Sequence, residues 1–223
     1  MKLRDIYNEV RLLIEKNRTN NNLYLTEDRF VLYFNFLKDK IQNYFLDKRS
    51  DDAIRLMAPF LIINKKLTEK SSQDLFSTYQ LPEDYFDFSN MLIYAKKNKC
   101  TPQQMLAHEI KSENIHQYLS DVNLKPSFLY RETFYLLNSE GITVFTDNDF
   151  KIHSLNFSYY KKIKEVDLSG YIHMDGTPST DIDTDITDSL VPVFVNSIVK
   201  YFTASQGDVT NYQIATQDLM SAI

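Results

Sequence analysis

Three aspartates alternate near the carboxyl end of the chain, in the stretch Asp181-Ile182-Asp183-Thr184-Asp185. Alternating carboxylates open a calcium-binding loop because they can converge on one hard cation. The second half of such a loop is missing here, since the sixth position is Ile186 rather than glycine and the twelfth is Pro192 rather than glutamate. We therefore favour an acidic, solvated loop over 181–188. The alternative is an intracellular metal-binding or regulatory protein that uses this loop together with His173.

Other reactive side chains lack the neighbours that chemistry would need. His108-Glu109 begins like a zinc-protease helix, but the next histidine is His116, eight positions further on, and the ligand spacing is wrong. Cys100 has two lysines beside it and no recognisable catalytic partner. Neither a Gly-x-Ser-x-Gly motif nor a Gly-x-x-x-x-Gly-Lys phosphate loop occurs. The sequence predicts no catalytic residue, no resident metal and no cofactor.

Charge and composition narrow the class of protein. The 223 residues include 25 Lys and Arg against 30 Asp and Glu, a formal charge of −5. A mild acidic excess argues against binding DNA or an anionic membrane face. Cys100 is the only cysteine, which excludes an internal disulfide framework. The charged start of the chain and the lack of a long apolar run predict a protein that is neither secreted by a cleaved leader nor membrane-spanning.

Helical periodicity dominates the first part of the chain. Apolar residues at helical spacing predict an amphipathic helix over 3–14, followed by a loop over 17–22. Thr26 can cap a longer helix, and a third should run from Ser50 or Asp51 to Ala58, before Pro59. The apolar stripe predicted for the second helix is Phe30, Phe34, Leu37, Ile41, Tyr44 and Phe45.

Strand patterns follow Pro59. Extended segments are predicted at 60–63, 75–82, 84–95, 129–137, 141–145 and 151–160, where the last alternates as a sheet with one buried face requires. Thr101-Pro102-Gln103-Gln104 has the residues of a helix start, with Thr as cap and Pro at the first helical position. We therefore predict a helical insertion near 101–119 within the strand region.

Helices return at the carboxyl end. An apolar stripe from Leu190 to Phe202 predicts a helix with Pro192 in its first turn, and a last helix should run from Thr210 to Met220. The predicted class is α+β, with N- and C-terminal helices packing as a bundle around a central mixed or antiparallel β region. The predicted parts, forming one structural unit, are 1–58, 59–186 and 187–223.

The aromatic content is unusual, with 15 Tyr, 15 Phe and no Trp. Tyrosine suits partly hydrated contact surfaces, and several aromatic residues fall in segments that look like loops or strand edges. A well-packed β core would explain the same residues almost as well. The candidates for contacts between subunits are Tyr79, Tyr85, Phe86, Phe88, Tyr159, Tyr160 and Tyr212.

The stretch Tyr79-Gln80-Leu81-Pro82-Glu83-Asp84-Tyr85 resembles an element of the head-to-tail adaptor (tail tubular, or neck ring) proteins of short-tailed bacteriophages, including the crAss-like group. Other landmarks of that family follow in order. They are a strand ending in Tyr159-Tyr160-Lys161-Lys162, then an acidic loop with a proline, then the apolar helix from Leu190. Two features depart from the family pattern. The stretch from Cys100 to Asn123 looks like a helical insertion, and Lys162-Ile163 stands where the family usually has a proline after the tyrosine pair.

The resemblance implies a virion structural protein of the neck or tail, assembled in the host cytoplasm. It implies a homo-oligomeric ring of about twelve copies, docked below the portal protein and offering its far face to the next tail or neck ring protein. DNA would pass through the lumen in transit, and no membrane is involved. An acidic wall suits that passage, because a basic wall would retain the duplex.

Overall fold

A computed structural model describes residues 2–16, 24–139, 141–206 and 213 of the chain. The predicted loop over 17–22, Tyr212 and almost all of the helix predicted over 210–220 lie outside these residues. The chain divides into two compact units, one of residues 1–60 and 162–223 and the other of residues 61–161. Among the described helices, none is long and apolar enough to cross a membrane.

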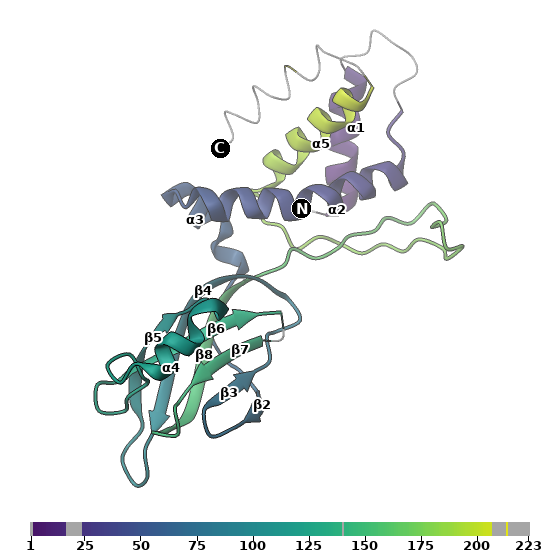
Figure 1. The fold of residues 1–223 in the computed structure, drawn as a ribbon. Helices are drawn as coiled ribbons and strands as arrows, with labels where there is room; N and C mark the ends of the chain where they lie inside the picture. Colours follow the sequence, from purple (N-terminus) through teal and green to yellow (C-terminus); the bar gives the residue numbers. More distant parts are fainter. Residues whose placement is uncertain (1, 17–23, 140, 207–212, 214–223) are drawn as a thin grey trace. The chain divides into compact units, whose positions relative to one another are not determined.

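The helical unit contains α1 (Leu3–Lys16), α2 (Glu27–Lys48), α3 (Asp51–Met57), the 3-10 turn η1 (Ala58–Phe60) and α5 (Val191–Ser205) (Figure 1). Each of the four predicted α-helices in the described part of this unit is confirmed. The Ser50 hydroxyl caps α3 by accepting a 3.2 Å hydrogen bond from the Ala53 amide. Thr26 stands at the cap position of α2 without a side-chain hydrogen bond, and Pro192 lies in the first turn of α5.

The carboxyl-terminal helix packs against helices from the amino-terminal part. The ring of Phe194 on α5 stacks on that of Phe34 on α2, with centroids 4.8 Å apart. Tyr7 of α1 meets Phe30 of α2 edge to face at 5.3 Å. These rings are buried, and the contact of Phe34 with Phe194 joins segments 160 residues apart in the sequence.

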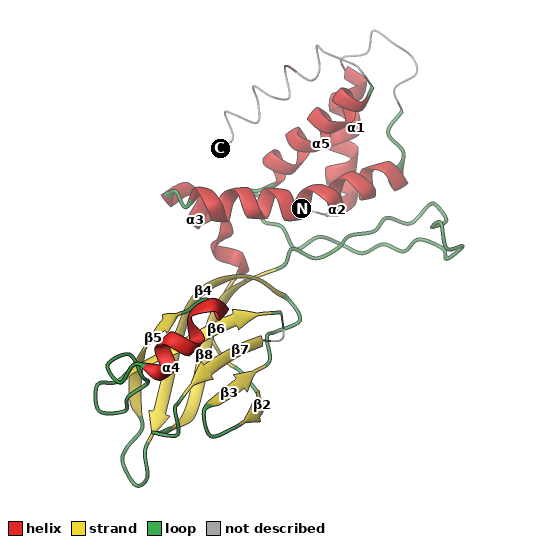
Figure 2. Cartoon of the chain, viewed as in Figure 1, coloured by secondary structure: helices red, strands yellow, loops and turns green. Residues whose placement is uncertain are grey.

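The other unit is an eight-stranded sheet curled into a half-barrel (Figure 2). Its strands are β1 (Leu61–Lys66), β2 (Glu69–Ser72), β3 (Phe76–Tyr79), β4 (Tyr85–Lys96), β5 (Gln103–Glu109), β6 (Glu132–Asn138), β7 (Gly141–Phe145) and β8 (Lys151–Lys161). The order across the sheet is β1-β8-β4-β5-β6-β7-β3-β2, and the α+β class is confirmed. The β5–β6 pair is parallel, whereas the other pairs are antiparallel.

The two edge strands of this sheet are consecutive in the chain. Only Leu67 and Thr68 separate β1 from β2, although these strands stand at opposite ends of the strand order. The connecting residues bond to both sides, because the Leu67 amide donates to the Leu155 carbonyl and the Gln80 amide donates to the Thr68 carbonyl. One bent segment therefore borders both edges of the half-barrel. At its start, Leu61 pairs with Tyr160 near the end of β8.

Every second residue along the strands points to the inside of the half-barrel and forms its apolar core. On β8, Leu155, Phe157 and Tyr159 are fully buried, as the period-two pattern predicts. They share one apolar cluster with residues from the facing strands, including Met91, Ile93, Ile142 and Val144.

The helical insertion predicted near 101–119 is wrong over its first half. Gln103–Glu109 form β5, which pairs with β4 on one side and β6 on the other. Only the 3-10 turn η2 (Ser112–Asn114) and α4 (Ile115–Ser120) are helical. Pairing on both sides and burial of Met105 outweigh the local helix-start signal of Thr101 and Pro102.

Candidate functional site

Residues 164–188 leave the helical unit as a long two-legged arm, and we call this segment the arm (Figure 1). Its legs are joined by isolated bridges, Asp167 with Ile182 and Ile172 with Pro178. The Asp167 amide donates to the Ile182 carbonyl at 3.1 Å and the reverse hydrogen bond is 2.9 Å. The acidic loop predicted over 181–188 thus contains no regular strand or helix, as expected, but Ile182 pairs it with the other leg.

Asp167 is the centre of the arm's polar network. Its carboxylate accepts hydrogen bonds from the Tyr171 hydroxyl at 2.6 Å and from the Thr180 amide at 2.9 Å, and it lies 3.1 Å from the Nε2 atom of His173. Only 7% of the residue is exposed. Burial raises the pKa of this carboxyl, but the hydrogen bonds from Tyr171, Thr180, His173 and Leu168 outweigh burial and leave the pKa below its ordinary value. Asp167 is therefore held ionised to join the two legs.

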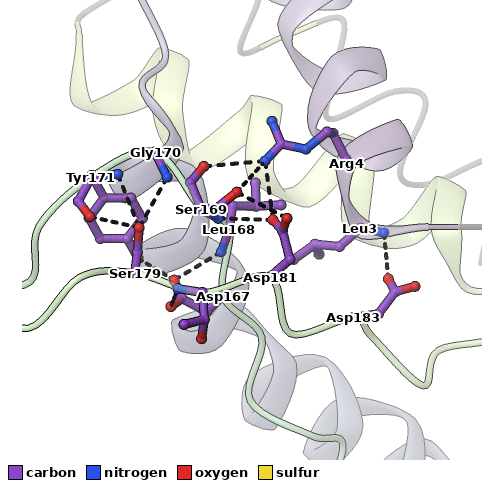
Figure 3. A network of polar contacts seen from close by, with 11 residues as sticks. Leu3, Arg4, Asp167, Leu168, Ser169, Gly170, Tyr171, Ser179, Asp181 and Asp183 are labelled. Atoms are coloured by element: carbon purple, nitrogen blue, oxygen red, sulfur yellow. Dashed lines mark hydrogen bonds and ion pairs between the residues drawn. The ribbon is translucent and has the colours of Figure 1, made fainter.

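A second set of contacts braces the arm against α1 (Figure 3). Asp181 accepts hydrogen bonds from the Ser169 amide at 2.9 Å and from the Arg4 guanidinium at 3.1 Å. The bonds from Ser169 and then Arg4 lower the pKa of the Asp181 carboxyl. Asp183 accepts a 2.7 Å hydrogen bond from the Leu3 amide, one of the free amides at the start of α1. Two of the three alternating aspartates thus fix the arm to one helix end.

The start of the arm is also fixed to α2. Asn35 makes a double hydrogen bond with the backbone of Val166, donating at 2.9 Å and accepting at 3.0 Å. Val166 and Leu168 are buried, so the base of the arm belongs to the core of the helical unit. The arm is consequently pre-formed near its base.

The tip of the arm has the opposite character. Ile172 is 73% exposed and Met174 is fully exposed, while the backbone of His173 closes the turn through hydrogen bonds with Gly176 and Thr177. The arm holds one lysine and seven acidic residues, a formal charge of −6, so the rest of the chain sums to +1. The charge of the arm therefore more than accounts for the net negative charge of the chain, and its tip carries the exposed apolar side chains of Ile172 and Met174.

The metal-binding alternative finds little support in this geometry. Asp181, Asp183 and Asp185 accept hydrogen bonds from different donors, the last from the Lys164 amide at 3.1 Å. His173 contacts Asp167 rather than these three. Within the described ranges, no group of three or more His, Cys, Asp or Glu residues is arranged to hold a metal ion.

The structure places the aromatic interface candidates mainly in the β core. Tyr79 and Tyr159 are buried in the half-barrel, and Tyr85 and Phe88 pack against the same cluster. The Tyr159 hydroxyl donates to Asp84 at 2.7 Å and accepts from Lys65 at 3.1 Å. Burial raises the pKa of Tyr85 to about 12. Tyr79 and Tyr159 therefore stabilise the fold rather than offer contact surface; Phe86 and Tyr160 are half-buried.

A different set of aromatic residues is exposed, and the sequence interpretation missed it. Leu32, Phe36, Lys40, Tyr44 and Lys48 recur every four residues on α2 and are all exposed, so Tyr44 is wrongly placed in the predicted core stripe. Tyr201 of α5 meets Phe36 at 6.2 Å. We call these six residues the basic–aromatic stripe. One feature of the sequence could have indicated this exposed face: the segment of α2 contains more apolar residues than one buried face needs.

Cations cover the rings of this stripe. The Lys40 ammonium lies 4.0 Å from the centre of the Phe36 ring and 5.8 Å from that of Tyr201, and Lys48 lies 5.7 Å from that of Tyr44. Neither lysine has a carboxylate partner among the residues that the structure describes.

Comparison with known proteins identified no relative of this chain: neither a family model nor a curated protein matches it.

Proposed function

We propose that this protein is a virion structural protein that forms a ring between the portal and the tail of a short-tailed bacteriophage. In this role it lets DNA pass and presents a docking surface for the next tail or neck ring. The proposal starts from the ordered landmarks of the sequence. Tyr79 ends β3, Tyr85 begins β4, and the Tyr159-Tyr160 pair lies one residue before the end of β8, which is followed by the arm and α5.

The observation that carries the proposal is the arm. Its base is fixed by Asp167, Asp181 and Asp183, while the apolar side chains at its tip touch solvent. A single chain gains nothing from exposing Ile172 and Met174 on a pre-formed projection, whereas a subunit that must contact a neighbour does. A closed ring needs two different complementary surfaces on each copy, and the arm is suited to be one of them.

The helices at the two ends of the chain extend this proposal. In the proposed ring, α1, α2 and α5 form a bundle that contacts neighbouring copies and the portal. The half-barrel then extends toward the next ring. The acidity of the arm suits a DNA conduit, because a wall of this charge does not retain the duplex.

Electron microscopy of virions tests the proposal directly. Particles carrying this chain should show ring-shaped density for it at the portal–tail junction, into which the helical unit and the half-barrel can each be fitted. Density for this chain anywhere else in the particle, or its absence from purified virions, would overturn the proposal.

A further inference from the structure

We propose that the arm of one copy docks its tip on the basic–aromatic stripe of a second copy. The contact joins Ile172, Met174 and Asp175 of one copy to Phe36 and Lys40 of another. It deepens the proposed function by naming the surfaces through which copies meet. The inference rests on the proposed function in one respect only, namely that successive contacts close into a ring.

Charge complementarity points to this occupant. The arm carries a formal charge of −6, and Asp175 at its tip is exposed. Lys40 and Lys48 of the stripe lack a carboxylate partner within the described part of the chain. An acidic, extended segment is the partner that unpaired ammonium groups beside aromatic rings would select.

Apolar chemistry points the same way. Met174 presents a flexible thioether, which packs well against aromatic rings, and Phe36 with Tyr201 offers two such rings. Phe36 is 51% exposed and Leu32 is 67% exposed, so the stripe has apolar area to cover. Residues Leu32 to Lys48 rise roughly 24 Å along the helix axis, enough to receive the tip of a two-stranded hairpin.

The contact must join two copies rather than fold back within one. In the single chain the tip side chains of Ile172 and Met174 are exposed, and so are Phe36 and Lys40. The arm begins on a different face of α2, where Asn35 contacts Val166 and the buried Lys38 contacts Glu165. Each copy therefore contributes its arm tip to one contact and its stripe to another. Such a contact between two different surfaces is heterologous, or head-to-tail.

Mixing two complementary variants tests this arrangement. The arm variant is Ile172→Asp with Met174→Asp, and the stripe variant is Phe36→Asp with Lys40→Glu. Sedimentation velocity should show concentration-dependent association of the unaltered chain and association weaker by about tenfold or more for either variant alone. An equimolar mixture should restore pairing but stop at dimers, because each pair retains one intact contact.

A matched control addresses non-specific effects of added charge. Leu129 is 80% exposed on the β unit, away from both surfaces in the sequence, and Leu129→Asp should associate like the unaltered chain. Circular dichroism should give the same spectrum for all variants. For a milder pair, Met174→Ala and Lys40→Ala should weaken association in the same direction without adding acidic groups to an apolar surface.

Three results of the association experiments would overturn the inference. They are a chain that stays monomeric at its highest soluble concentration, variants that associate like the unaltered chain, and a mixture that does not pair. Virions with ring density at the portal–tail junction, together with any of these results, would leave the proposed function standing and reject this contact. Binding of single-stranded DNA by the stripe, lost in Phe36→Asp with Lys40→Glu while self-association persists, would also reject it.

Discussion

The Tyr171 hydroxyl donates a 2.6 Å hydrogen bond to the carboxylate of Asp167, four residues earlier on the same leg of the arm. The same carboxylate reaches the opposite leg through the Thr180 amide. One ionised side chain therefore holds both legs, and burial together with this bond raises the pKa of Tyr171 above its ordinary value. The hydroxyl stays protonated and able to donate throughout the physiological pH range.

Replacing Asp167 should loosen the arm without unfolding the helices. Asp167→Asn removes the charge that strengthens several hydrogen bonds, so the free energy of local opening should fall by about 2 kcal/mol. Hydrogen exchange of amides in residues 169–181 should accelerate accordingly, while exchange in α2 stays unchanged. Glu165→Gln is the control, because its exposed carboxylate lies in the same segment without joining the legs. Equal exchange in the two variants would refute the role given to Asp167.

Acid should loosen the arm in the same way. The folded-state pKa of Asp167 is depressed, so its stabilising contribution is present above the unfolded-state pKa, near 4, and is lost as the pH falls through the folded-state pKa. Asp181 shifts in the same direction. The free energy of opening of the arm, measured by hydrogen exchange corrected for the pH dependence of intrinsic exchange, should therefore be constant near neutrality and fall below about pH 4. Asp167→Asn should flatten this dependence, whereas an unchanged pH profile would contradict it.

Gly141 should tolerate no side chain. Its φ is +138°, and a Cβ atom there would lie 2.1 Å from the carbonyl oxygen of Tyr79, a backbone atom of the neighbouring strand that cannot easily move. Gly141→Ala should lower the free energy of unfolding of the half-barrel by about 2–4 kcal/mol. Gly176→Ala is the matched control, because it shares a positive φ but has open space around it. Similar losses in chemical denaturation of both variants would contradict the steric explanation.

Tyr159 should behave as a core residue. Tyr159→Ala removes a fully buried ring that stacks on Phe157 at 5.6 Å, and should cost about 3–5 kcal/mol of stability. Tyr159→Phe should cost less, since it keeps the ring and loses only the hydroxyl bonds to Asp84 and Lys65. Tyr130, 75% exposed, supplies the control: its alanine variant should unfold at the same denaturant concentration as the unaltered chain. A Tyr159→Ala chain of normal stability would restore this residue as an interface candidate.

Local sequence patterns correctly predicted the helices and strands whose buried face in the structure is the one that the pattern indicates. The stripes of α1 and α5 and the alternation of β8 each report one buried face, and the structure buries that face. The Thr101-Pro102 start signal failed because β5 gains ladders with two strands, one of them more than 25 residues away. The curl of the sheet is equally non-local, so the sequence could not show that Tyr79 and Tyr159 face the same interior.

The candidate site was harder to predict than the elements that hold it. The acidic stretch of 181–185 drew attention as a metal loop, yet two of its carboxylates bind the first turn of α1, more than 170 residues earlier. Nothing in the spacing of these aspartates indicates that partner. The exposed aromatic face of α2 could not be predicted for a related reason. Tyr44 fits the helical period of the buried stripe, and only packing determines which apolar residues remain exposed.

The pairing of Leu61 with Tyr160 means that the chain enters and leaves the half-barrel at adjacent points of one ladder. Residues 61–161 thus form a unit inserted between the two parts of the helical unit. If the half-barrel were removed, a short loop could reconnect the helical unit, and the two ends of the half-barrel would remain paired with each other. Such an arrangement allows the half-barrel to be exchanged or lengthened during evolution while the helices and the arm keep their own contacts.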